Sequence, residues 1–424
     1  MLFRVGWVVV GLLATGALAG AADWPQWGGP DRNAVSKETG LLKAWPSGGP
    51  KLLWTYDKAG IGYSSPSIVG DTLYCLGGEG GKEFAFALDT KSGKQKWKVP
   101  LGSEYKNGYG GGPRSTPTID DGSMYFLCAD GGLYCLETTS GKQRWQVSLS
   151  RDLGGKMMSG WGYSESPLID GDKLICTPGA GNGSMAALDK KSGKVLWRSN
   201  GLTANAAYSS AIVAEVGGIR HYVQMTREGL VGVSTDGKVL WQQNVCVNGV
   251  AICPSPIFSD NCVYITSDYG AGCALVKLTA SGGGIQSELV YNNKNMQNHH
   301  GGVVLIDGYL YGCSGNVNNK KPRFDWECQE FKTGKVVWKD DQKFEAGSVV
   351  YADGYIYCYG QVKGNVVRIE ASPKGWQENG RFTIPKETSI PRGTGQIWTH
   401  PVIANGKLYL RDQDLLFCYD ISAK

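Results

Sequence analysis

The residues best able to do chemistry in this sequence lie just before a series of short apolar segments. They combine one arginine, one carboxylate, three histidines and four large aromatic side chains: Arg114, Trp161, Tyr163, Glu165, Tyr208, His299, His300, Trp398 and His400. Arginine can clamp an anion, aromatic rings can stack on a ligand, and a carboxylate with a histidine can exchange protons. If the apolar segments come together, these residues form one ligand-binding mouth.

Several of these candidates also have a purely structural interpretation. Trp161 and Trp398 can serve as packing lids rather than as stacking surfaces. Arg114 follows a glycine-rich segment, residues 109–113, and can either brace that segment or clamp a carboxylate or quinone. Glu165 and His400 would form an acid–base pair only if two distant loops meet, so we assign no catalytic residue.

The sequence does not predict a metal site. His299 and His300 are adjacent, and adjacent side chains of an extended segment point in opposite directions, which hinders binding of one ion by both. The cysteines show no zinc-ribbon spacing, and most fall inside apolar segments, where cysteine is a small core residue. One or two disulfides in the stretch from Cys246 to Cys273 remain an open alternative.

The elements that position the candidates are internal repeats. Residues 65–97 hold four short apolar runs separated by turns, and the pattern returns at 116–145 and 166–197. In the last turn of a unit an acidic residue can accept backbone N–H groups and glycine supplies a positive φ, while the next tryptophan can cover the seam between sheets. The residues that carry the repeat are Asp89, Gly93, Trp97, Gly141, Trp145, Asp189, Gly193, Trp197, Trp241, Gly334 and Trp338.

The order of the units predicts a closed ring. Outer-strand tryptophans are evenly spaced up to Trp241, and the distance from there to Trp338 spans two units, so the fifth unit rests on spacing alone. Residues 51–56 form an outer strand without inner strands, and 401–419 lack an outer strand. Joining them completes a blade and leaves no free edge. We predict an all-β fold, a single eight-bladed propeller of four-stranded antiparallel blades at residues 51–424.

The amino-terminal residues predict export. Arg4, an apolar run and the small residues around Ala19 are typical of a cleaved secretory signal over residues 1–21, followed by a leader over 22–50. No cysteine is placed for lipidation, so we expect a periplasmic or secreted protein. No later segment is apolar for long enough to span a membrane. The net charge of +5 is dispersed, which disfavours nucleic acid as a partner, and we expect a monomer.

Segments 87–97 and 187–197 resemble the tryptophan docking motif of pyrroloquinoline quinone (PQQ) dehydrogenases. Segments 135–145 and 328–338 match it with Glu in place of Asp, and residues 24–27, Trp-Pro-Gln-Trp, resemble a leader that precedes such propellers in exported bacterial proteins. The motif is shared by alcohol dehydrogenases that hold PQQ and by BamB-like barrel-assembly proteins that hold none. The resemblance therefore implies the fold and leaves the activity open.

Departures from both subgroups set the functional expectation. The vicinal cysteine pair, the calcium-binding Glu and Asn with the catalytic Asp, and the haem attachment site of quinoprotein dehydrogenases have no counterpart here. We expect a non-enzymatic binding or scaffold protein, without a cofactor, that binds a protein partner or small ligand in the cell envelope. One alternative is a dehydrogenase of alcohols or polymers that uses PQQ with calcium. Another is a carbohydrate-binding propeller that stacks sugars on Trp161, Tyr163 and Trp398.

Overall fold

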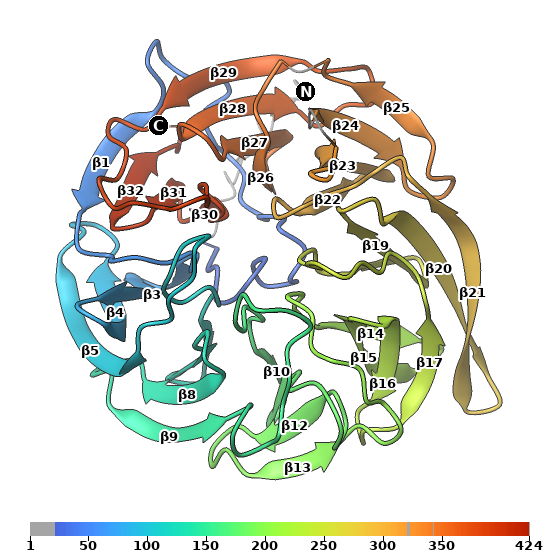
Figure 1. Cartoon of the computed structure of the whole chain (residues 1–424). Coiled ribbons are helices and arrows are strands. Elements are labelled where there is room, and N and C mark those ends of the chain that lie inside the picture. Colours follow the sequence, from blue (N-terminus) through green and yellow to red (C-terminus); the bar gives the residue numbers. More distant parts are fainter. Residues whose placement is uncertain (1–21, 320–322, 342, 424) are drawn as a thin grey trace, which may run out of the picture.

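The computed structural model describes residues 22–319, 323–341 and 343–423, and the predicted signal segment 1–21 lies outside these ranges. Within them the chain forms eight antiparallel sheets of four strands each, arranged as blades around a central axis (Figure 1). The predicted eight-bladed, all-β propeller is confirmed, including the fifth blade. No helix in the described ranges has the length and apolar character that crossing a membrane requires.

The blades follow one another along the chain, and the strands of each run from the axis outward. Blades 1 to 4 comprise β2 (Ser67–Val69), β3 (Thr72–Glu79), β4 (Lys82–Asp89), β5 (Gln95–Ser103); β6 (Thr118–Asp120), β7 (Ser123–Leu127), β8 (Gly132–Glu137), β9 (Gln143–Ser148); β10 (Leu168–Asp170), β11 (Lys173–Cys176), β12 (Ala186–Asp189), β13 (Val195–Arg198); and β14 (Ile212–Val216), β15 (Ile219–Thr226), β16 (Gly229–Ser234), β17 (Val239–Gln243). Blades 5 to 8 comprise β18 (Ile257–Ser259), β19 (Cys262–Ser267), β20 (Gly272–Ser281), β21 (Gly284–Asn293); β22 (Val303–Ile306), β23 (Tyr309–Gly315), β24 (Phe324–Glu330), β25 (Val336–Lys339); β26 (Gly347–Ala352), β27 (Tyr355–Gly360), β28 (Asn365–Glu370), β29 (Glu378–Thr383); and β30 (Val402–Ala404), β31 (Lys407–Asp412), β32 (Leu415–Asp420), β1 (Lys51–Tyr56).

The first and last strands of the propeller close the ring. β1 pairs antiparallel with β32, with Trp54 opposite Cys418, so the predicted joining of the two ends is confirmed. Arg411 of β31 adds a polar link across the same seam. Its buried guanidinium donates to the carbonyl oxygens of Ser64 at 2.8 Å and Leu76 at 2.7 Å, both in blade 1.

Neighbouring blades pack against both faces of each sheet. The middle strands β3, β7 and β8 are therefore buried along nearly their whole length and read as continuous apolar runs rather than as alternating ones. Outer strands such as β5 keep polar, partly exposed residues. The ring of packed blades is the rigid scaffold that carries the loops at its two ends.

The repeated tryptophans join each blade to the next. Trp97 of β5 donates its Nε1–H to the carbonyl oxygen of Thr138 in blade 2, at 2.8 Å. Trp145 of β9 donates in the same way to Lys190 in blade 3, at 2.9 Å, and its ring lies over Gly193. A Cβ atom at Gly193 would approach that ring to 2.9 Å, so only glycine permits the close contact. The predicted role of these residues at the seams is confirmed.

The turn that precedes each docking strand has the predicted chemistry. Asp89 accepts the backbone N–H of Ser92 at 2.8 Å and its hydroxyl at 2.6 Å, and Asp189 holds Ser192 in the same way. Gly93 closes the turn with a φ of 67°, in the left-handed region that glycine adopts without steric cost. The acidic side chain and the glycine thus fix the turn on which the neighbouring tryptophan docks.

Trp241 is an exception among the repeated tryptophans. Its Nε1–H points back to Nε2 of His221 in its own blade, at 3.2 Å, instead of to the next blade. The next blade offers no matching turn, because β20 and β21 form a long hairpin that closes at residues 281–284. At the following seam Gly334 accordingly lies against Tyr291 rather than against a tryptophan.

Hydroxyl side chains link the blades close to the axis. The backbone N–H of Thr116 donates to Oγ of Ser166 at 2.9 Å, that of Ser166 to Oγ of Ser210 at 2.9 Å, and that of Ser210 to Oγ of Ser255 at 3.3 Å. Each of these residues precedes the innermost strand of its blade. The hydroxyl residue at this place in the repeat therefore holds adjacent inner strands in register around the channel.

The leader packs along the ring and reaches the axis (blue in Figure 1). Trp24 forms an antiparallel bridge with Ile68 of β2, and Val35 forms a parallel bridge with Tyr351 of β26. The backbone N–H of Ile119 in β6 donates to the carbonyl oxygen of leader residue 25 at 2.8 Å. The leader is therefore fixed to blades 1, 2 and 7 by main-chain hydrogen bonds.

The cysteines contribute to the core as unpaired thiols. All twelve are free, and all except Cys253 are buried. Cys246 and Cys273 are both unbridged, which decides the alternative that the sequence left open. Within the described residues the blades are therefore held together by packing and hydrogen bonds and not by disulfides.

Candidate functional site

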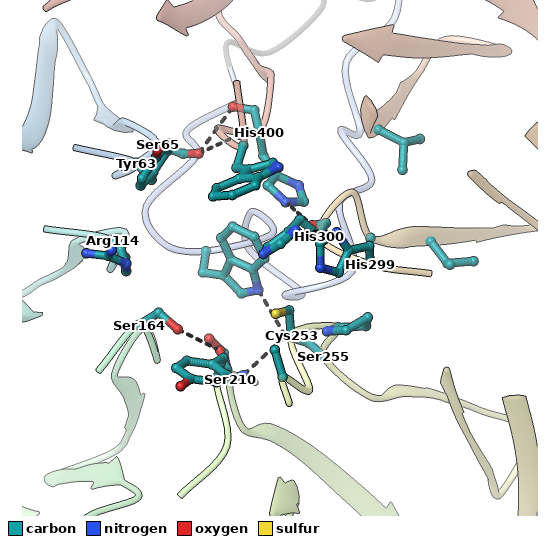
Figure 2. A pocket seen from close by; sticks show the side chains of 18 of the residues that line it. Tyr63, Ser65, Arg114, Ser164, Ser210, Cys253, Ser255, His299, His300 and His400 are labelled. Carbon is teal, nitrogen blue, oxygen red and sulfur yellow. Dashed lines mark hydrogen bonds between the residues drawn. The ribbon is translucent and has the colours of Figure 1, made fainter. Parts of the chain in front are cut away.

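The channel at the axis of the ring contains a cavity of about 560 Å³. Its wall is built mainly from the loops that lead into the innermost strands and from the leader, and turns between the second and third strands of some blades add residues such as Tyr269. Figure 2 shows Arg114 on one side of this cavity and His299 and His300 on the other. Because every blade presents one loop to the axis, residues far apart in the sequence meet here.

The cavity brings together seven of the nine residues proposed from sequence. These are Arg114, Trp161, Tyr208, His299, His300, Trp398 and His400. Tyr163 and Glu165 do not line the cavity. Tyr163 is buried in the apolar core between blades 2 and 3, and its hydroxyl donates to the carbonyl oxygen of Pro178 at 2.9 Å. It therefore offers no stacking surface to a ligand in the channel.

Glu165 is a buried link between blades 3 and 4. Its carboxylate accepts the backbone N–H and the hydroxyl of Thr177, at 2.7 and 2.9 Å, and the side-chain N–H of Gln224 at 2.9 Å. Burial raises the pKa of Glu165 to about 7. His400 instead donates Nε2–H to the carbonyl oxygen of His300 at 2.8 Å, so the structure does not join Glu165 and His400 as an acid–base pair.

A chain of three polar side chains forms one wall. The hydroxyl of Tyr269 lies 2.8 Å from Nε2 of His299, whose Nδ1 lies 2.9 Å from Nδ1 of His300. The expectation that these adjacent histidines point apart is wrong, because they lie in an irregular segment between β21 and β22 and not in an extended strand. The ring of His300 also stacks on Trp398, with centroids 4.5 Å apart.

The imidazoles in the cavity are neutral near pH 7. Burial lowers the pKa of His299 and of His400 to about 4 each, and it lowers that of His300 well below its usual range. Two neutral rings can share the Nδ1 contact only if one donates and the other accepts. The His299–His300 pair is therefore a neutral hydrogen-bonding unit, and within the described residues no group of three or more His, Cys, Asp or Glu is arranged to bind a metal ion.

Arg114 braces the glycine-rich loop, as one of its two interpretations proposed. Its two terminal nitrogens donate to the carbonyl oxygens of Gly110 and Gly112, each at 2.7 Å, and its guanidinium lies over the rings of Tyr105 and Tyr63. These bonds use two of the five N–H groups of the side chain. Arg114 also lines the cavity, so bracing the loop holds the positive charge in a fixed position at the wall.

Sequence reasoning missed two residues that the leader places in the cavity, Trp27 and Arg32. Trp27 donates Nε1–H to Oγ of Ser255 at 3.1 Å. Arg32 reaches blade 3, where its guanidinium donates to the carbonyl oxygens of Ser166 at 2.8 Å and Pro167 at 3.2 Å. The sequence singled out the Trp-Pro-Gln-Trp segment of the leader but gave no signal that it reaches the channel.

The wall of the cavity does not fit a calcium–quinone centre. Among the described residues that line it there is no aspartate or glutamate, and the charged side chains are the cations Arg32 and Arg114. Calcium binds through several oxygen ligands in which carboxylates predominate. Cys253 is the lining cysteine, and no neighbouring cysteine accompanies it in the sequence. We therefore derive no chemistry through such a group.

The fold and the cavity define an eight-bladed propeller with a ligand-sized site on its axis. A model of the family described as outer membrane protein assembly factor BamB matches residues 13–159 and 81–321. The chain belongs to this family. No curated protein matched it.

Two dehydrogenases of known structure share the fold of this chain at low sequence identity. A europium-containing methanol dehydrogenase is 13% identical, with 92% of this chain and 89% of that chain covered and a TM-score of 0.55. Quinohemoprotein alcohol dehydrogenase from Comamonas testosteroni is 12% identical, with coverage of 95% and 81% and a TM-score of 0.52. BamB from Moraxella catarrhalis is 16% identical, with coverage of 85% and 84% and a TM-score of 0.44.

Proposed function

We propose that this protein is a non-catalytic propeller that holds a small ligand in its central cavity. The observation that carries the proposal is the make-up of the wall: aromatic rings, two guanidinium groups and three neutral imidazoles, without a carboxylate among the described lining residues. A volume of about 560 Å³ lies within the usual range for ligand sites. The described residues of the wall offer stacking and hydrogen bonding but no carboxylate base and no ligand set for calcium.

A location in the cell envelope is part of the same proposal. The apolar run after Arg4 supports export, and the family description names an assembly factor of outer-membrane proteins. A protein partner in the envelope agrees with that description. The cavity itself is suited to a small molecule, because its rings and polar groups face inward around the axis.

Carbohydrate binding is less well supported. A sugar stacks on an open aromatic face, but Trp161 is flanked by Tyr109, with centroids 5.8 Å apart and planes at 72°, and by Tyr208 at 6.0 Å. Tyr163, the second predicted platform, is buried in the core. The third, Trp398, is stacked against the ring of His300, so all three proposed stacking residues are already engaged or buried.

Native mass spectrometry of the protein purified from the cells that make it tests the proposal. Gln396 lines the cavity, and Gln396→Trp fills part of it, whereas Lys191→Trp adds the same ring at an exposed turn in blade 3. We expect a bound small molecule on the wild-type protein and on Lys191→Trp, and its loss from Gln396→Trp.

A second readout covers the case in which the ligand is lost during purification. The same three proteins are heated with a chemically diverse set of small molecules, and bound ligands raise the midpoint of unfolding. We expect some compounds to stabilise the wild type and Lys191→Trp but not Gln396→Trp. The proposal fails if no molecule is retained and no compound discriminates between the variants.

A further inference from the structure

The charged groups in the cavity wall are all of one sign. Arg32 and Arg114 line it, and none of its described lining residues is an aspartate or glutamate. The histidines of the wall add no charge near pH 7, because burial lowers the pKa of His299 and of His400 to about 4 and lowers that of His300 well below its usual range. The described wall of the cavity is therefore electropositive near pH 7.

Arg32 is buried without a carboxylate partner among the described residues. It is 6% exposed, and its terminal nitrogens bond to neutral acceptors, the carbonyl oxygens of Ser166 and Pro167 and the side-chain oxygen of Gln26 at 3.0 Å. Its Nε–H is buried and finds no acceptor in the described part of the chain. Burial lowers the pKa of Arg32 to about 10.

The nearest acidic influence on Arg32 comes from Glu165, which does not neutralise it. The carboxylate oxygens of Glu165 accept hydrogen bonds from Thr177 and Gln224. Because its pKa is raised to about 7, Glu165 is only partly ionised at neutral pH. A buried cation without a counter-ion is energetically unfavourable. An anion in the adjoining cavity would relieve that penalty, and no carboxylate among the described lining residues would repel it.

The rest of the wall favours a flat molecule. Trp27, Tyr63, Trp161, Tyr208 and Trp398 come from the leader and from four different blades, and all line the same space. A planar unsaturated ring can meet aromatic rings edge to face, and such a contact does not need the open ring face that a sugar requires. Such rings also fill space with few rotatable bonds, which lowers the entropic cost of binding.

We propose that the ligand is a small organic anion with a flat unsaturated ring, and that Arg32 of the leader, together with Arg114, selects its negative charge. This inference rests on the proposed function, since it specifies the ligand of the same cavity. Arg32 supplies a buried charge from outside the repeats, whereas Arg114 supplies a charge fixed by its bonds to the glycine-rich loop. A neutral molecule of the same shape would gain the stacking but not the attraction.

Calorimetric titration with a matched pair of probes tests the inference. 2-Naphthoate and 2-naphthamide have nearly the same shape and differ in charge. We expect the purified wild-type protein to bind the naphthoate at least ten times more tightly than the amide. Arg32→Gln and Arg114→Gln should each reduce this ratio at least threefold, mainly through weaker binding of the acid.

Two further variants keep the test interpretable. Arg144→Gln removes an exposed arginine from the outer strand β9 and should leave the ratio unchanged. Arg32→Lys retains the charge and should keep most of the preference for the acid. If Arg32→Gln does not fold, the ratios of acid to amide affinity in the wild type, Arg32→Lys and Arg114→Gln show whether the arginines select the negative charge.

The possible failures are distinguishable. Equal affinity for acid and amide, or a preference that both arginine-to-glutamine variants leave intact, would overturn the anion assignment while the proposed function stands. Binding of neither probe would also overturn it. The retention and heating experiments with Gln396→Trp decide separately whether the cavity holds a ligand at all.

Discussion

The indole of Trp27 meets the imidazole of His400 edge to face, with ring centroids 4.5 Å apart and planes at 71°. Trp27 belongs to the leader, and His400 immediately precedes β30 in the last blade. The contact shows that the leader is a structural part of the cavity wall and not an appended tail. The wall of the cavity therefore combines residues of the leader with residues of the last blade.

Replacing Trp27 should lower the free energy of unfolding and remove part of the cavity wall. Trp27→Ala removes the contact with His400 and the hydrogen bond to Ser255, and we expect a loss of about 2 kcal/mol in the free energy of unfolding. Trp27→Phe keeps an aromatic ring at this position, so its free energy of unfolding should fall by less. Denaturant unfolding followed by circular dichroism measures both. Wild-type stability in Trp27→Ala would show that the leader is not seated as described.

The docking glycines should tolerate substitution less well than other glycines with the same backbone conformation. Gly193 and Gly171 both have positive φ, 72° and 60°. Gly171→Ala meets no atom within 4 Å and should cost about 1 kcal/mol for the backbone alone. Gly193→Ala also displaces the Trp145 ring and should cost at least about 1 kcal/mol more. Equal losses measured by urea unfolding would contradict the docking role of Gly193.

Arg411 should stabilise the closure between blades 8 and 1. Arg411→Met removes the guanidinium that donates to the buried carbonyl oxygens of Ser64 and Leu76 in blade 1. We expect a loss of about 3 kcal/mol or more. Arg220→Met, at an exposed ion pair with Asp170, should lose less than about 1 kcal/mol. Thermal unfolding compares them, and similar midpoints for the two variants would refute this assignment.

Glu165 should make stability depend on pH in a defined direction. Because its folded pKa, about 7, exceeds the ordinary glutamate value of 4.5, its contribution to stability is complete below about pH 4.5 and is lost as the pH rises through 7. Glu165→Gln cannot ionise, so its stability relative to wild type should improve between pH 5 and pH 8, by up to about 3 kcal/mol.

The exposed Glu387 offers a control for this pH dependence. Glu387→Gln should track the wild-type protein across the same pH range, as measured by urea unfolding at each pH. A constant difference between Glu165→Gln and wild type would mean that burial does not raise the pKa of Glu165 in solution.

The sequence predicted the ring because the information for it is local and repeated. The turn of Asp89 and Gly93 and the docking of Trp97 each depend on a few neighbouring residues, and every copy reinforces the count of blades. The degenerate fifth blade could still be placed by spacing, because a closed ring requires four strands between its neighbours. Trp241 donates to His221 of its own blade instead of docking on the next blade, yet the blade still forms.

Side-chain direction was the part of the site that could not be predicted. Ser164 lines the cavity, whereas its neighbours Tyr163 and Glu165 are buried away from it, as alternate residues of an extended segment point to opposite sides. The loop was therefore identified correctly, but not which of its residues face the axis. Trp27 and Arg32 lie outside the repeats, so no periodic signal could assign them to the channel.

The most direct test of the central claim is calorimetric titration of the purified protein with PQQ, in the presence and in the absence of Ca²⁺. A cavity with two arginines and no carboxylate among its described lining residues can attract an aromatic anion but cannot hold calcium beside it. We therefore predict that Ca²⁺ does not change the affinity for PQQ, whatever that affinity is. Tight binding that requires Ca²⁺, with reduction of an artificial dye in the presence of an alcohol, would contradict a non-catalytic binding propeller.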